Sequence, residues 1–253
     1  MSLYLSPLVG LVPAAFLAGF IDAIAGGGGL ITVPALLLSG LPAPIALGTN
    51  KGQSVFGAVS SFVTYLRQGG IDRKLAGPGF ILGFLGSIVG ALTVLALDPA
   101  LLRPFVAVLL PVAATAVAIV RPKESGKALL PPIFRLLVAL ALGFYDGFFG
   151  PGTGTFLILL YVVLFAESMR SASANAKVVN LASNMAAVMI FTFRGSVRWD
   201  IAFPMALANA LGAALGARLA WKRGTPFIRA IVVLVAFGVA IKVVVDAWRA
   251  RHG

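Results

Sequence analysis

The 253-residue sequence contains no cysteine and a single histidine, His252. The lack of cysteine excludes disulfide bonds, thiolate metal sites and a cysteine nucleophile. Because the one histidine is the next-to-last residue, a histidine metal cluster and a Ser-His-Asp triad are excluded as well. We therefore predict that the protein is not an enzyme and that it uses no metal and no cofactor.

Charged residues are also scarce, at 11% of the chain, whereas 60% is hydrophobic and the mean hydropathy is +1.02. An ordinary soluble domain has roughly 25% charged residues. A globule with so few charges would expose large apolar patches and aggregate. The composition predicts an all-α polytopic membrane protein whose main partner is the lipid bilayer.

The 20 basic residues outnumber the 8 acidic ones and give a net charge of +12. They lie between apolar runs, as in the cytoplasmic loops of membrane proteins, so we predict no nucleic-acid partner. No Lys or Arg precedes Lys51, so the start of the chain lacks the basic segment of a signal peptide. We expect the first apolar run to be retained as a membrane segment.

The apolar runs are of two lengths, compared with the roughly 20 residues that a membrane-spanning helix needs. Two runs, residues 3–41 and 132–166, are too long for one helix and too short for two complete ones. Six have the length of one span: residues 43–66, 75–97, 100–120, 172–193, 201–221 and 226–248.

The two long runs resemble each other. Four residues recur 124 positions later, namely Gly19 as Gly143, Asp22 as Asp146, Gly26 as Gly150 and Gly28 as Gly152. Further along, Asn50 and Lys51 are echoed by Asn175 and Lys177. We predict two homologous repeats of four to five helical segments, residues 1–120 and 132–253, joined by a polar linker at 121–131. Duplication with a break in corresponding segments is typical of secondary transporters.

The relative orientation of the repeats depends on the long runs. If each long run is one span, the repeats are parallel, and if each is a broken or re-entrant pair, they are inverted. The distribution of Lys and Arg in the loops fits both arrangements. We favour the inverted one, because long apolar runs interrupted by glycine fit a broken pair better than a single helix.

Glycine runs interrupt both long segments, and glycine and proline disfavour continued helix. A half-helix that starts after such a break would present free N–H groups and a positive dipole end to an anion inside the membrane. The alternative is close helix packing through small residues. Candidate substrate-binding residues at the breaks are Gly26, Gly27, Gly28, Gly29, Gly150, Gly152, Thr153 and Gly154.

Two acidic residues, Asp22 and Asp146, lie about one helical turn before the breaks. A carboxylate in apolar surroundings is costly unless it is paired, protonated or hydrated. We expect these residues either to couple transport to protons or to brace the broken loop, and the alternative is a simple helix cap.

Basic and amide side chains gather in the apolar runs that follow each break. Lysines there would attract an anion, although a lysine near a helix start can also snorkel to the membrane surface. Asn180 and Asn184 share one helical face, where amides line a polar cavity or join two helices. The remaining substrate-binding candidates are Asn50, Lys51, Gln53, Asn175, Lys177, Asn180 and Asn184.

These motifs together resemble the sulfite exporter TauE/SafE family, also called the 4-toluene sulfonate uptake permeases. The resemblance extends in order over nearly the whole chain, on Gly19 to Gly29, Ala46 to Lys51, Gly70 to Asp72, Gly143 to Gly154, Lys177 to Asn184 and Gly195 to Trp199. It implies an inner-membrane carrier of sulfite, sulfonates or other small, often sulfur-containing anions. The second half is less typical, because Pro151 and Thr153 replace two glycines of the first half.

We therefore expect a multi-pass secondary transporter of small anions in the cell inner membrane, working by alternating access. The alternatives are an anion channel and a carrier of another carboxylate or inorganic anion. An intramembrane enzyme and a scaffold without transport are weaker alternatives, and the sequence also allows a homodimer.

Overall fold

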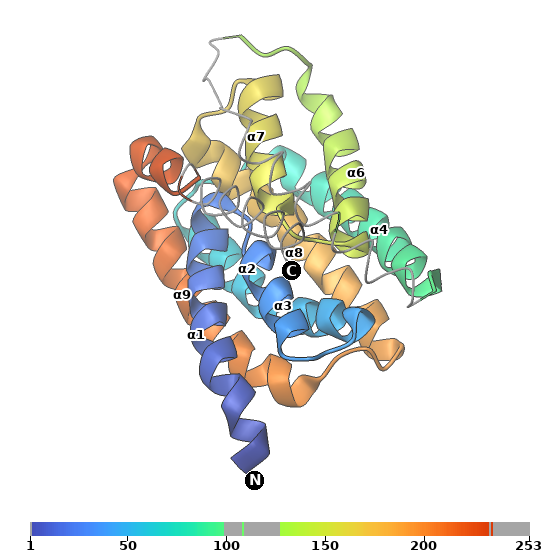
Figure 1. The fold of residues 1–253 in the computed structure, drawn as a ribbon. Coiled ribbons are helices and arrows are strands. Elements are labelled where there is room, and N and C mark those ends of the chain that lie inside the picture. The colour runs from blue at the N-terminus through green and yellow to red at the C-terminus, as the bar shows by residue number, and fades with distance from the viewer. Residues whose placement is uncertain (1, 99–107, 109–126, 233, 235–253) are drawn as a thin grey trace, which may run out of the picture.

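A computed structural model of the chain describes residues 2–98, 108, 127–232 and 234. These residues form eight α-helices, one short 3₁₀ helix and a further helical segment at 225–232, and there is no strand among them, which confirms the predicted all-helical fold (Figure 1). Three predicted segments lie wholly or mostly outside the described residues: 100–120, 226–248 and the first part of the linker at 121–131.

Both long apolar runs are split into two helices. The first forms α1 (Ser2–Ala25) and α2 (Gly29–Leu38). The second begins with η1 (Pro132–Phe134) and forms α6 (Arg135–Phe148) and α7 (Thr153–Phe165). Glycines at both breaks have positive φ angles, +74° at Gly26 and +98° at Gly150, which other residues adopt only with strain. The glycine runs therefore end the helices where the sequence predicts.

Four longer helices surround these broken pairs: α3 (Ala43–Arg67), α4 (Arg73–Ala96), α8 (Met169–Phe193) and α9 (Trp199–Arg223). Side chains cap two of their starts, because Asp72 accepts a hydrogen bond from the N–H of Lys74 and Ser168 accepts one from Ser171. The first residues of α3 and α8 are 126 positions apart, and both helices have 25 residues.

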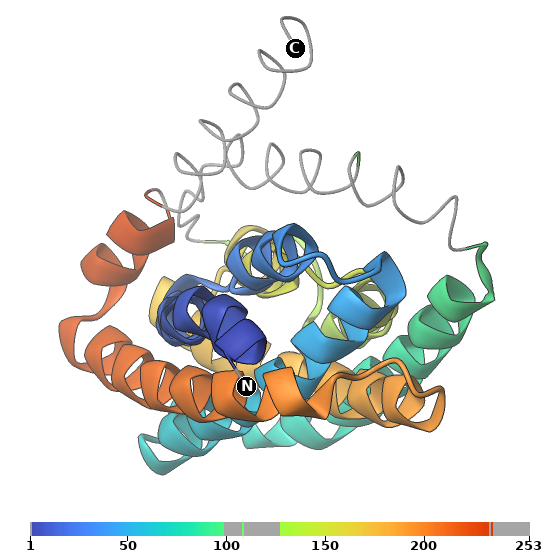
Figure 2. The same ribbon diagram turned by 60° about the horizontal axis from the view of Figure 1, so that its bottom comes forward.

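Helices of the first half pack mainly on helices of the second half. Helix α1 lies alongside α9, and α6 lies alongside α4, in the views of both Figure 1 and Figure 2. Glycines allow the close approach: a Cβ added at Gly212 of α9 would overlap the carbonyl of Phe16 on α1. In Figure 1, α1 rises from the N-terminus to its break, whereas α6 descends to its own, so the two breaks meet inside the molecule, near α3 and α8.

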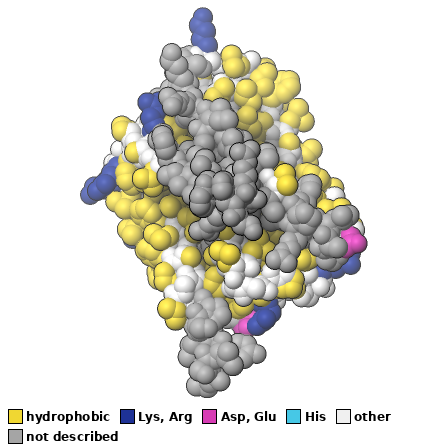
Figure 3. Space-filling model, in the orientation of Figure 1, with side chains coloured by type: hydrophobic (Ala, Val, Ile, Leu, Met, Phe, Trp, Pro, Cys, Tyr) yellow, Lys and Arg dark blue, Asp and Glu magenta, His cyan; other side chains and the backbone are white. Residues whose placement is uncertain are grey.

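Where Figure 3 draws described residues, hydrophobic side chains cover most of the surface, with Lys and Arg near its edges. Large hydrophobic side chains such as Leu38 and Phe193 are more than four-fifths exposed. In the described part of the chain, four helical segments are long and apolar enough to cross a membrane: Leu8–Ala25, Arg73–Ala96, Met169–Phe193 and Trp199–Arg223. The arrangement is that of a multi-pass membrane protein with lipid-facing side chains outside and polar groups within.

Candidate functional site

The two breaks cross each other in van der Waals contact. A Cβ added at Gly26 would overlap the backbone of Gly154 and Thr155, and one added at Gly29 would lie 3.2 Å from the Cα of Pro151. The N-terminal ends of α2 and α7 are therefore brought together, although they belong to segments about 124 residues apart.

A polar cavity lies between these helix ends. It has about 30 Å³ of space for the centres of water-sized molecules, enough for about two waters. Residues from seven helices and both breaks line it: Asp22, Gly27, Gly28, Gly29, Asn50, Lys51, Ser54, Ala58, Asp146, Gly150, Gly152, Thr153, Gly154, Asn180, Asn184 and Asn209.

Backbone donors at the cavity are left without partners. Within the described residues, the N–H groups of Gly27, Gly29, Gly152 and Gly154 have no hydrogen-bond acceptor. The N–H of Gly28, by contrast, donates to the carboxylate of Asp22 at 3.1 Å. Unpaired donors at two helix N-termini, where the helix dipoles are positive, favour a negatively charged group in the cavity.

One buried ion pair borders the cavity. The ammonium of Lys51, on α3, lies 2.8 Å from the carboxylate of Asp146, on α6, and both side chains are at most 5% exposed. Asp146 also accepts hydrogen bonds from the hydroxyl of Ser183 and, at 3.4 Å, from the amide of Asn184. The pair therefore connects helices from opposite halves of the chain.

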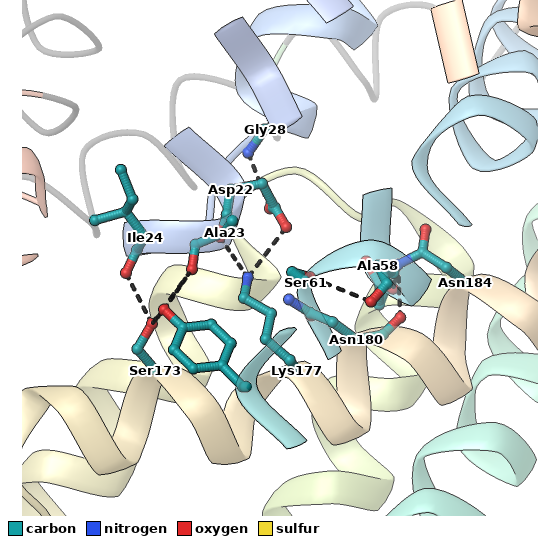
Figure 4. A network of polar contacts seen from close by, with 12 residues as sticks. Asp22, Ala23, Ile24, Gly28, Ala58, Ser61, Ser173, Lys177, Asn180 and Asn184 are labelled. Carbon is teal, nitrogen blue, oxygen red and sulfur yellow. Dashed lines mark hydrogen bonds and ion pairs between the residues drawn. The ribbon is translucent and has the colours of Figure 1, made fainter. Parts of the chain in front are cut away.

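A second ion pair joins a lysine of the second half to an aspartate of the first half. Lys177, on α8, lies 3.1 Å from the carboxylate of Asp22, on α1, and also donates to the main-chain carbonyl of Asp22 (Figure 4). Its side chain is fully buried, whereas that of Asp22 is 31% exposed. The interpretation of these lysines as snorkelling groups is wrong, because protein covers both ammonium groups.

The end of α1 is held by two further side chains. The hydroxyl of Tyr65, on α3, donates to the carbonyl of Ala23 at 2.9 Å, and the hydroxyl of Ser173, on α8, donates to the carbonyl of Ile24 at 2.8 Å (Figure 4). Carbonyls at a helix C-terminus lack intrahelical partners, so these bonds satisfy them and fix the break.

Four predicted site residues do not line the cavity: Gly26, Gln53, Asn175 and Lys177. Gly26 forms the crossing of the breaks, and Lys177 lies behind Asp22. Gln53 donates to the side-chain oxygen of Asn50 at 3.2 Å and so supports a residue that does line the cavity.

Asn175 belongs to a separate polar cluster. Its amide donates to Glu167 and its oxygen accepts from the N–H of Asp72, both at 2.8 Å, while Arg135 forms ion pairs with both acidic residues. Asn175 precedes Lys177 by two residues, which on an α-helix is a rotation of about 200°, so the two side chains face opposite ways.

Three lining residues were absent from the sequence prediction: Ser54, Ala58 and Asn209. Ser54 lies one helical turn beyond Asn50 on the same face, and a helical projection would have found it. Asn209 is a polar residue in the middle of the apolar run 201–221, which is itself a signal. In the described part of the chain, no group of three or more His, Cys, Asp or Glu residues could hold a metal ion.

Comparisons with known proteins place the chain among membrane transporters. The sequence profile of the family described as "Sulfite exporter TauE/SafE" matches residues 11–243. A protein of Haemophilus influenzae named "Probable membrane transporter protein" is 39% identical over 235 residues, covering 91% of this chain and 92% of its own.

Two further relatives are of similar length. "Probable membrane transporter protein ORF9" of a Sinorhizobium species is 37% identical over 243 residues, covering 93% of this chain and 92% of its own. "Probable membrane transporter protein YfcA" of Escherichia coli K12 is 35% identical over 240 residues, covering 92% and 88%. No solved structure matches the chain.

Proposed function

Because the chain belongs to the sulfite exporter TauE/SafE family of membrane transporters, we propose that it is a secondary carrier of small anions in the inner membrane. Sulfite and sulfonates are the proposed substrate class, and the cavity between the two breaks is the proposed binding site. The family name is the ground for the sulfur chemistry, whereas the cavity is the ground for the charge and size of the substrate.

The observation that carries this proposal is that glycines from both breaks, whose N–H groups have no acceptor among the described residues, line one polar cavity. An anion that leaves water needs donors to replace its hydration shell, and a hydrogen bond to a charged group is worth about 1.5–3 kcal/mol. The four N–H groups of Gly27, Gly29, Gly152 and Gly154, which have no acceptor in the described part of the chain, match an oxyanion with three oxygens, each of which accepts more than one bond.

The proposal of alternating access is supported by the way in which the halves interlock. Helices α1 and α6 run in opposite directions toward the cavity, and each break is tied by an ion pair to a helix of the other half. We propose that the halves are inverted repeats and that rocking of one against the other opens the cavity to each side of the membrane in turn. Asp22 and Asp146 brace the breaks, couple transport to protons, or do both.

Counterflow in proteoliposomes tests the proposal. Vesicles loaded with unlabelled methanesulfonate should transiently accumulate labelled methanesulfonate from outside, because a carrier exchanges one anion for another. A channel would give electrical conductance without such accumulation, and vesicles without either response would refute an anion-transport function.

A matched pair of alanine variants connects the flux to the breaks. In Gly154→Ala the new Cβ would lie 2.8 Å from the Cα of Gly26 and 2.9 Å from the side-chain amide nitrogen of Asn180, so the helix ends must move. Gly77→Ala adds a methyl group to open space on α4. We expect about tenfold or greater loss of apparent affinity in Gly154→Ala, the effect of one lost charge-assisted hydrogen bond, and none in Gly77→Ala.

A further inference from the structure

The two ion pairs occupy corresponding places in the two halves, yet their surroundings differ. We propose that the Lys51–Asp146 pair is the working pair, in which Lys51 binds the anion while Asp146 takes up a proton. In this proposal the Lys177–Asp22 pair is a fixed brace that positions the break of α1. The inference rests on the proposed function of the cavity as an anion site.

The first difference is where each ammonium lies. Lys51 lines the cavity and lies beside the second break, where a Cβ added at Gly150 would be 3.0 Å from its Nζ. Lys177 does not line the cavity, and it donates to both a carboxylate oxygen and the main-chain carbonyl of Asp22. Lys51 can therefore turn to an anion by leaving one partner, whereas Lys177 would have to break two contacts with Asp22.

The second difference is how each break is anchored. Tyr65 and Ser173 hold the last carbonyls of α1, as described above. The residues 126 positions away from them in the other half are Phe191 and Leu47, which have no polar group to donate. The break of α1 is thus fixed to α3 and α8 independently of its ion pair. The second break is instead held by bonds within its own segment, because the hydroxyl of Tyr145 donates to the carbonyl of Pro151 at 2.8 Å and that of Thr153 to the carbonyl of Gly150 at 2.7 Å.

The third difference concerns protonation. The described partners of Asp22, the N–H of Gly28 and the ammonium of Lys177, are both hydrogen-bond donors, so they favour the ionised carboxylate. Asp146 instead contacts the hydroxyl of Ser183, which can donate to a carboxylate or accept from a carboxylic acid. When the hydroxyl of Ser183 accepts from the carboxylic acid, the hydroxyl hydrogen can point to the carbonyl oxygen of Asn180, which lies 3.2 Å from the Oγ of Ser183.

Charge balance then links the proton to the anion. If an anion takes Lys51 from Asp146, the carboxylate is left buried at 4% exposure without its counter-charge, which is strongly unfavourable. Uptake of one proton forms an O–H bond on the carboxylate and removes that charge, while Lys51 remains an ammonium. One anion and one proton enter together, and the net charge of the cavity does not change.

The described elements around Asp146 supply few other charged groups. Lys51 comes from α3, and Asp22 of α1 lines the same cavity with Lys177 of α8 behind it. Helices α2 and α7 contain no charged residue. The charged residues of α4 lie at its start, beside Asp72 and the opposite end of α6. The titratable neighbour on α6 itself is Tyr145.

The proposal predicts that anion binding weakens as the pH rises. Because the two ligands favour each other, affinity should fall by up to tenfold for each pH unit when one proton accompanies one anion. Methanesulfonate is the suitable probe, since a sulfonate remains a monoanion between pH 5 and 8, whereas sulfite changes its own charge in that range.

The experiment measures the dissociation constant of methanesulfonate by calorimetry on the purified full chain at several pH values. A pH-sensitive dye inside proteoliposomes reports, in parallel, whether protons enter with the anion. We expect a pH-dependent dissociation constant and proton entry in the wild type. In Asp146→Asn the dissociation constant should be independent of pH, and anion flux should occur without proton entry.

The matched variant Asp22→Asn should keep the pH dependence while it lowers thermal stability. A wild type that binds methanesulfonate with the same affinity at every pH and carries no protons would overturn the inference and leave the anion site standing. The same conclusion would follow if Asp146→Asn kept the pH dependence or if Asp22→Asn lost it. Absence of any anion binding by the wild type would refute the proposed function and this inference together.

Discussion

Replacement of Lys177 by methionine isolates the brace between α8 and α1. The ammonium of Lys177 contacts both the carboxylate and the main-chain carbonyl of Asp22, and its side chain is fully buried. Methionine has nearly the same length and is apolar, so Lys177→Met removes both contacts and leaves little empty space. The loss of stability should therefore report the brace itself.

The size of this loss follows from the burial of the two partners. Removal of one member of a buried ion pair costs about 3–5 kcal/mol, because the other member is left unpaired. The side chain of Asp22 is 31% exposed, so water can solvate part of the remaining carboxylate. We therefore expect a loss of about 2–3 kcal/mol, which corresponds to a decrease in Tm of about 5–10 °C for a chain of this size.

Thermal unfolding of the full chain in detergent, followed by circular dichroism, measures the effect. Lys74→Met is the control, because Lys74 is exposed at the start of α4 and its replacement should change stability by no more than about 0.5 kcal/mol. Asp22→Asn and the double variant complete a cycle in which the two losses should not add. A Tm for Lys177→Met within about 1 °C of the wild type, or fully additive losses, would refute the brace.

Two further substitutions test the packing and the boundary of the site. Gly212→Ala places a methyl group on the carbonyl of Phe16 where α1 contacts α9, so size-exclusion chromatography should show loss of folded protein, whereas Gly77→Ala should elute as the wild type. Asn175→Ala removes hydrogen bonds to Glu167 and Asp72, so the free energy of unfolding should fall by about 1–3 kcal/mol and Tm should fall with it. The affinity for methanesulfonate should change less than about twofold. A folded Gly212→Ala, or an Asn175→Ala with strongly weakened binding, would contradict the helix contact and the site boundary respectively.

The features that the sequence predicted well depend on local chemistry. Composition alone indicates a helical membrane protein, and the glycines at 26–29 and 150–154 break the helices because their conformations are local properties. Duplicated residues also marked both aspartates and both lysines as a set. Most of the predicted residues at the breaks do line one cavity.

What the sequence did not predict is which of these residues contact each other. The pairing of Lys177 with Asp22 joins residues 155 positions apart, and it depends on how α8 packs against the end of α1. A pattern of lysines in apolar runs is compatible with free charges, snorkelling groups or ion pairs, and tertiary packing decides between them. Asn175 lies outside the cavity for a related reason. It is similar to Asn50 in its place before a lysine, but it is two residues from Lys177, so the helix turns its side chain away from the cavity.

The central claim is that a small oxyanion binds between the two helix N-termini. Crystals of the full chain grown with selenite, a pyramidal analogue of sulfite, would locate the anion by the anomalous signal of selenium. We expect one strong peak in the cavity, within hydrogen-bond reach of the N–H groups of Gly27, Gly29, Gly152 and Gly154 and next to Lys51. Selenium bound only elsewhere, with the cavity holding water alone, would contradict it.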